Sequence, residues 1–196
     1  MTISDTRTAS LEELVKNSFK LAQLPSEYTR AMQVRSIALE LALHYGLDKN
    51  QTSAAALLHN ISRLIPQTEY LKFAQEYNIE IFPEEKENPF LLHQKISRVI
   101  AVEQFNITDK EVLNAISCHT TLRKSATLLD KIIFLATKQN DNKLKSLTFR
   151  NAHPSEAEKE LNSIIYSYLF NLLNNKKLIT TIHPWAQEAL EDLQTK

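Results

Sequence analysis

Glycine is nearly absent from this sequence. Gly46 is the single glycine among 196 residues, where average usage of about 7% would give roughly 14. The glycine-rich loops that hold phosphates in P-loop and dinucleotide-binding proteins need several glycines for close backbone approach, so both kinds of site are excluded. So few glycines also leave few residues suited to turns with positive φ, which favours an all-helical fold.

The sequence also has a single cysteine, a net charge of zero and no long apolar run. Cys118 is the one cysteine, so no internal disulfide forms and a reducing, cytoplasmic setting is expected. Lys plus Arg and Asp plus Glu number 23 each, which argues against a general nucleic-acid-binding protein or a polybasic membrane protein. No apolar run approaches the roughly 18 residues of a membrane span, and the polar N-terminus lacks the pattern of a signal peptide.

What the sequence does have is helical spacing of apolar residues along almost its whole length. Capping boxes are predicted at Ser10–Glu13 and Thr108–Glu111, and residues 78–89 are predicted to form an acidic loop. We expect one all-α bundle, with an N-terminal helical extension (1–24), a core (25–140) and a C-terminal helical section packed on the core (141–196). The spacing predicts helices over residues 10–22, 26–45, 52–64, 66–77, 90–105, 109–120, 126–139, 154–174 and 184–194.

Several polar side chains fall among the apolar residues of these predicted helices. Arg30 lies on the apolar stripe of the 26–45 helix, and His59 and Asn60 interrupt the apolar stretch AAALLHNISRLI. His93 lies near the start of the 90–105 helix, and His119 lies near the end of the next one. A histidine near an apolar face is usually a hydrogen-bonded core residue, so spacing alone is only a weak indication of a metal site.

Four stretches carry a resemblance to a known family. The stretches ALELALHYGLD, AAALLHNISR, LLHQKISR and EVLNAISCHTTLRKSATLLDKIIFLATK resemble, in order and spacing, the bacterial HD-domain family of YqeK type. Members of that family split diadenosine tetraphosphate symmetrically into two ADP. The resemblance covers about residues 25–140 well and the remainder to about 194 loosely, and it implies an all-helical HD bundle.

The resemblance also implies a metal ion, often iron, held by four side chains. These are a histidine on the first core helix, an adjacent His-Asp pair and an aspartate on a later helix. Only the histidine of the His-Asp pair is present here. In this sequence the four positions are held by Arg30, His59, Asn60 and Thr137.

Other positions of the family's cleft are kept more fully. Arg63 stands where the family has lysine, and four further residues match: His93, His119, Thr120 and Arg123. Three positions where the family has glycine are Ser97, Leu122 and Ser125 here.

The exchanges at the metal positions reverse the local charge. The family set of two neutral histidines and two aspartates carries two negative charges, whereas Arg30, His59, Asn60 and Thr137 carry one positive charge. At an effective dielectric near 20, two unit charges 4 Å apart interact with an energy of about 4 kcal/mol, and the energy doubles when one of them is a divalent ion. Arginine stays protonated, and without a metal no water is acidified for attack on phosphorus. We therefore predict a degenerate HD-domain protein that holds no cofactor and does not carry out the family's hydrolysis.

A cleft without its metal keeps several cations. Four arginines are candidates to bind an anion such as a nucleotide phosphate through bidentate contacts: Arg30, Arg63, Arg98 and Arg123. The plain structural alternative is that Arg30 fills the volume of the metal and pairs with an internal acid such as Asp130.

Two further functions stay open from the sequence. One is an active phosphohydrolase, dependent on iron or another divalent metal, with a metal site rebuilt from His59, His93 and His119. The other is a protein-interaction module that uses the acidic 78–89 loop or the C-terminal helices to bind a protein partner or a second copy of the chain in a homodimer.

Overall fold

The computed structural model describes residues 9–141, 154–175 and 181–195, and every regular element in these ranges is helical, as predicted. Short 3₁₀ turns connect several of the α-helices. In chain order the elements are α1 (Leu11–Leu21), α2 (Pro25–Tyr45), α3 (Lys49–Leu58), η1 (Ile61–Leu64), η2 (Gln67–Glu69), α4 (Tyr70–Glu76), α5 (Pro83–Glu87), η3 (Pro89–Leu92), α6 (His93–Phe105), α7 (Lys110–Cys118), α8 (Leu128–Asn140), α9 (Pro154–Leu173) and α10 (Pro184–Gln194).

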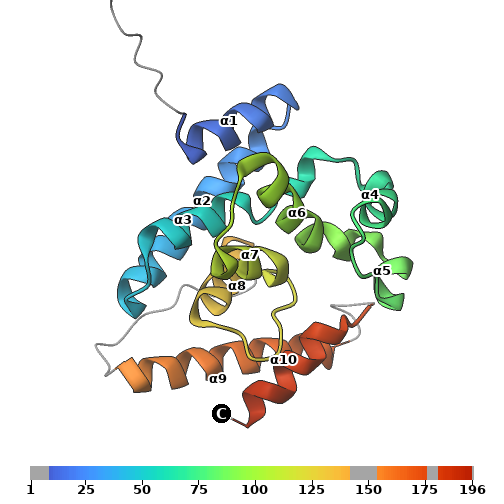
Figure 1. The fold of residues 1–196 in the computed structure, drawn as a ribbon. Helices are drawn as coiled ribbons and strands as arrows, with labels where there is room; N and C mark the ends of the chain where they lie inside the picture. The colour runs from blue at the N-terminus through green and yellow to red at the C-terminus, as the bar shows by residue number, and fades with distance from the viewer. Residues whose placement is uncertain (1–8, 142–153, 176–180, 196) are drawn as a thin grey trace, which may run out of the picture.

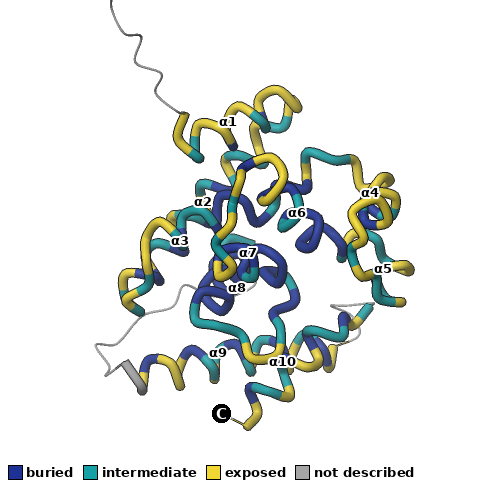
Figure 2. Tube along the Cα trace, viewed as in Figure 1, coloured by how far each residue is buried: buried dark blue, intermediate teal, exposed yellow. Residues whose placement is uncertain are grey.

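Helices α7 and α8 lie at the centre of the molecule, and α9 and α10 run along one side of it (Figure 1). Every residue from Leu129 to Lys138 of α8 is buried (Figure 2). A helix that is buried all round belongs to the core of a bundle. Because α8 carries both apolar and polar residues into this core, it also brings polar groups to the interior. None of the helices in the described ranges is long and apolar enough to cross a membrane.

Helix termini follow the local sequence with one correction. The predicted capping box of α1 is present, because Ser10 N–H donates to Glu13 Oε2 (3.0 Å) and Glu13 N–H donates to Ser10 Oγ (3.2 Å). Gly46 ends α2 with φ +69°. The predicted box at Thr108 is wrong, because the carboxylate of Asp109 caps α7 instead by accepting the first free backbone N–H groups.

The helix predicted over residues 52–64 is also wrong in its second half. Helix α3 ends at Leu58, and residues after Asn60 form the 3₁₀ turn η1. His59 provides the reason, since its ring Nδ1 lies 2.7 Å from the carbonyl oxygen of Ala56. In a continuing helix that oxygen would accept the N–H of Asn60, so the imidazole takes the place of a backbone donor where the helix stops.

The acidic loop predicted over residues 78–89 contains a short helix, α5, and one of its acids is buried. Glu85 accepts from Lys95 Nζ (2.8 Å), from His183 Nε2 (3.1 Å) and from the backbone N–H of Phe82 (2.8 Å). The ammonium group of Lys95 lies over the rings of Phe82 and Trp185. The cluster joins α5 and α6 to the N-terminus of α10, so this acid is not available on the surface for a protein partner.

Removal of Lys95 should destabilise the fold. Lys95→Met leaves Glu85 buried without its cation, and breaking such a buried pair costs about 3 kcal/mol or more. We expect a fall of this size in the free energy of unfolding, measured by urea denaturation. Lys72→Met is the matched control, because Lys72 is exposed and its contact with Glu76 is 4.0 Å long; it should change stability by less than about 0.5 kcal/mol. Equal effects of the two substitutions would contradict a structural role for the buried pair.

Candidate functional site

Three histidines meet where three helices begin or end. His59 follows the last residue of α3, His93 begins α6 and His119 follows α7. The Nδ1 atom of each ring lies 2.7 or 2.8 Å from the backbone carbonyl three residues earlier in the chain. A carbonyl only accepts, so Nδ1 carries the proton in all three rings. This fixes the orientation of the rings and leaves each Nε2 as the group that faces away from its own helix.

Few hydrogen-bond donors reach the Nε2 atoms of the three histidines. His93 Nε2 lies 3.1 Å from His119 Nε2 and accepts from Thr120 Oγ1 at 2.9 Å. The ring of His59 lies against that of His119, with centroids 5.0 Å apart. His59 Nε2 is buried and has no hydrogen-bond partner among the residues that the structure describes. An unpaired buried acceptor costs free energy, so a donor or a cation brought by a ligand would be favoured here.

All three histidines are neutral at physiological pH. Burial lowers the pKa of His59 from 6.5 to about 4 and that of His93 to about 3, although the backbone hydrogen bond of each ring opposes the shift. Burial and the neighbouring imidazoles hold the pKa of His119 well below its usual value. The cations of Arg30, Arg63 and Lys138 act in the same direction, because a nearby positive charge disfavours a second one.

Arg30 lies beside His59 and is paired with Asp141 at the end of α8. The prediction that Arg30 pairs with an internal acid names the wrong one, because Asp130 is bound by Arg123 instead. The helix separates the two acids by eleven residues, or about 16 Å along its axis, and α2 places Arg30 at the Asp141 end. The side chain of Arg30 is 34% exposed, so it remains within reach of solvent.

The other two metal positions contribute no anion. Thr137 Oγ1 donates to the carbonyl oxygen of Phe134 at 2.7 Å and also lies 3.3 Å from the carbonyl of His119. Asn60 precedes η1, and its side chain does not cap that turn. Neither residue replaces the carboxylates that the resemblance implies at these positions.

The residues around His59 do not fit a divalent cation. The imidazole has the geometry of a ligand, with Nδ1 bound to a carbonyl and Nε2 open. The other three metal positions, however, hold a guanidinium, an amide and a hydroxyl bound to its own helix, and the carboxylate of Asp141 is already paired with that guanidinium. Among the residues of the described ranges, no three His, Cys, Asp or Glu side chains are grouped so that they could hold a metal ion. A site rebuilt from His59, His93 and His119 therefore finds no support in this geometry.

The remaining predicted arginines lie in different surroundings. Arg63 is close enough to act on His93 and pairs with Glu27 (3.2 Å), with 39% of its side chain exposed. Arg123 is held by the buried carboxylate of Asp130 (2.7 Å). Arg98 follows His93 by five residues on α6, which turns it about 140° away around the helix. The structure thus brings Arg30 and Arg63 to the histidines, while Arg123 is bound to Asp130 and Arg98 faces another direction.

Lys138, Asp141 and Gln94 also belong to this site, although neither the apolar spacing nor the family resemblance singles them out. Lys138 Nζ donates to the carbonyl of Thr120 at 3.0 Å. Gln94 Oε1 accepts the backbone N–H of Thr120 at 3.1 Å, which fixes the segment after α7. One signal was available, because Asp141 comes one helical turn after Thr137 and can therefore present a carboxylate on nearly the same face.

Two of the positions where the family has glycine keep the backbone that glycine favours. Leu122 has φ +61° and Ser125 has φ +53°, both in the left-handed region. Ser97 differs, because its hydroxyl accepts the backbone N–H of Ser62 at 3.1 Å. The loop between α7 and α8 thus has positive φ angles at two residues that are not glycine, a conformation that leucine and serine rarely adopt.

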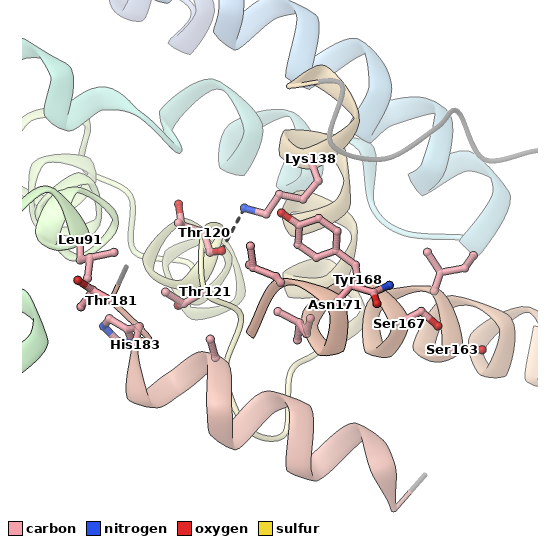
Figure 3. A pocket seen from close by; sticks show the side chains of 14 residues that line it. Leu91, Thr120, Thr121, Lys138, Ser163, Ser167, Tyr168, Asn171, Thr181 and His183 are labelled. Atoms are coloured by element: carbon pink, nitrogen blue, oxygen red, sulfur yellow. Dashed lines mark hydrogen bonds between the residues drawn. The ribbon is translucent and has the colours of Figure 1, made fainter. Parts of the chain in front are cut away.

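A cavity of about 730 Å³ adjoins Thr120, whose hydroxyl bonds His93. Figure 3 shows the side chains that line this cavity. Thr120 and Lys138 line one part of it, and polar side chains of α9 line another. Thr120 is shared, since its hydroxyl bonds His93 while the residue also forms part of the cavity wall. The cluster and the cavity are therefore two parts of one candidate site.

Comparison with known proteins agrees with this architecture. An uncharacterized protein in the pepC 5' region of Lactococcus lactis subsp. cremoris is 35% identical over 150 residues, which is 76% of each chain. A symmetrical bis(5'-nucleosyl)-tetraphosphatase of Halalkalibacterium halodurans is 30% identical over 150 residues, 74% of this chain and 76% of that protein.

A solved structure has the same fold. The crystal structure of a predicted HD superfamily hydrolase involved in NAD metabolism from Clostridium acetobutylicum superposes with a TM-score of 0.80 at 24% identity, covering 96% of this chain and 99% of that one. Residues 28–138 match the HD domain. The chain therefore belongs to the HD domain family and is related to the symmetrical bis(5'-nucleosyl)-tetraphosphatases.

Proposed function

We propose that this HD-domain protein binds a nucleotide or another phosphate-bearing ligand at the cluster of His59, His93 and His119, without a resident divalent metal, and does not hydrolyse it. The observation that carries the proposal is the guanidinium of Arg30, paired with Asp141, beside the buried Nε2 of His59, which has no partner within the described part of the chain. A fixed cation repels the metal ion and attracts a phosphate group at the same place.

The balance of charge around the histidines supports an anionic ligand. Three cations act on the imidazoles, namely Arg30, Arg63 and Lys138, and two carboxylates pair with the arginines. This leaves one net positive charge next to buried neutral rings. A phosphate monoester that still carries a proton, or a ribose hydroxyl, could donate to the open Nε2 of His59.

Arg63 can leave its ion pair and bind a ligand with little loss of free energy. Its bond to Glu27 is a partly exposed ion pair, and such pairs contribute about 0–1 kcal/mol. A charge-assisted bond from a guanidinium to a phosphate is stronger. The related proteins that are named bis(5'-nucleosyl)-tetraphosphatases make nucleotides the first ligands to try.

Calorimetric titration of the full chain with ADP in EDTA tests the binding. We expect saturable 1:1 binding, and Arg63→Gln should weaken it about tenfold because one charge-assisted bond is lost. Arg35→Gln is the matched control, since Arg35 pairs with Glu12 and should leave ADP binding unchanged. Absence of binding at millimolar ADP would contradict the proposal.

A separate assay tests the absence of hydrolysis. The purified chain should contain no stoichiometric iron, manganese or zinc by mass spectrometry, and incubation with diadenosine tetraphosphate and each of these ions should release no ADP. Stoichiometric metal together with ADP release would instead establish the metal-dependent phosphohydrolase.

A further inference from the structure

The guanidinium of Arg30 is already in contact with an anion, and that anion belongs to the chain itself. Asp141 is the C-cap residue of α8, and its backbone N–H donates to the carbonyl oxygen of Thr137 at 3.1 Å. Its carboxylate reaches α2 and pairs with Arg30. An internal carboxylate therefore lies at the cation that we expect to bind a phosphate group.

The position of Asp141 does not favour its own helix. The macrodipole of a helix places partial negative charge at the C-terminus, where an acidic side chain is unfavourable. The contact with Arg30 offsets this disadvantage from a different helix. The contact across the candidate site therefore explains an acid at this position better than the end of α8 does.

Asp141 acts on both parts of the candidate site. The pKa of His59 is lowered mainly by burial and further by Arg30, whereas the charge of Asp141 opposes this shift. Burial, with the charge of Asp141 as a smaller cause, raises the pKa of Tyr168 to about 12. Tyr168 lines the cavity (Figure 3). The carboxylate is therefore close enough to the histidines and to the cavity to act on a ligand in either place.

A phosphate group and the carboxylate of Asp141 compete for one cation. Two anions on the same guanidinium lie close together, where like charges repel strongly. The side chains of Arg30 and Asp141 are 34% and 21% exposed, and ion pairs within reach of solvent contribute little to stability. The pair can therefore open for a more strongly charged anion without loss of the fold.

We infer that Asp141 is an internal competitor, whose carboxylate occupies the guanidinium of Arg30 and lowers the affinity of the site for phosphate ligands. This inference rests on the proposed function, because it takes the same phosphate site as its starting point. Without this carboxylate the net charge around the histidines rises from plus one to plus two, since Glu27 on Arg63 is then the one acid left to balance three cations. The native chain therefore binds the ligand only at a higher concentration than its cations alone would require.

Titration of the full chain with ADP in EDTA tests this competition. Asp141→Asn keeps the size of the side chain and removes its charge, so the affinity for ADP should rise about tenfold or more. Asp141→Ser is a second uncharged variant with the same expected gain. Asp141→Glu keeps the charge and should bind ADP with nearly the native affinity. Glu12→Gln is the control, because Glu12 also pairs with an α2 arginine, Arg35, but not with Arg30.

The outcomes separate this inference from the proposed function. Unchanged or weaker binding of ADP by the two uncharged variants, in chains that melt like the native protein, would overturn the competition and leave the phosphate site standing. An equal gain in Asp141→Glu would also overturn it, because charge would then not be the cause. Binding by the uncharged variants alone would support the competition and overturn the proposed binding by the native chain. Absence of ADP binding in every chain would overturn both.

Discussion

The triple variant Arg30→His/Asn60→Asp/Thr137→Asp is expected to bind one divalent ion per chain at least a thousandfold more tightly than the native protein. The substitutions change the charge of the four positions around His59 from plus one to minus two. Two unit charges 4 Å apart interact with about 4 kcal/mol at an effective dielectric near 20. Each 1.4 kcal/mol of binding free energy changes the affinity about tenfold. Loss of the guanidinium also releases Asp141 from its ion pair.

Metal content after dialysis and calorimetric titration with Mn²⁺ measure this effect. Arg30→Gln is the control, because it removes the cation without supplying a ligand and should recover only a small part of the affinity. A triple variant that folds normally and still binds no ion would show that these four positions do not converge on one site. A divalent ion bound tightly at His59 in the native chain would contradict the charge argument itself.

The native protein is expected to lose about 6 kcal/mol of unfolding free energy between pH 7.5 and pH 5 in EDTA, because three buried histidines stay neutral in the folded state. The folded pKa values of His59 (about 4) and His93 (about 3) lie below 6.5, and that of His119 is also lowered. The unfolded chain therefore binds more protons below pH 6.5. Stability is fully present above that value and falls as the pH drops towards the folded pKa values.

Urea denaturation at pH 7.5, 6.5, 5.5 and 5.0 measures the loss. Each histidine contributes about 2 kcal/mol over this range, most of it below pH 6.5, where the slope approaches about 1.4 kcal/mol per pH unit. His59→Gln should therefore remove about one third of the dependence that the three residues produce. A free energy of unfolding that does not change between pH 7.5 and 5 would contradict the burial of the three neutral rings.

The candidate site could be predicted in part. The sequence and its resemblance singled out His59, His93, His119 and Thr120, and the fold brings all four together. The sequence places the cation of Arg30 at a metal position but does not identify Asp141 as its partner, because this requires knowing which end of α8 lies opposite α2. That is a matter of packing and leaves no local pattern.

Other residues lie beyond the reach of periodicity. Glu85 belongs to an acidic, turn-rich stretch that is typical of a solvated loop, and only its contacts with Lys95 and His183 explain its burial. Lys138 would be expected on an exposed helix face, yet it is buried and bonds the backbone after α7. A buried charge is stabilised by partners distant in sequence, so local composition does not reveal it.

The sequence by itself determined the helical fold, several helix termini and the chemical character of the metal positions, because these depend on local spacing and on the charge of individual side chains. The tertiary structure decided where helix α3 stops at His59, which acid neutralises Arg30 and which surfaces meet to form the cavity beside Thr120. Those features depend on contacts between residues far apart in the chain, and only the packing of the helices brings such residues together.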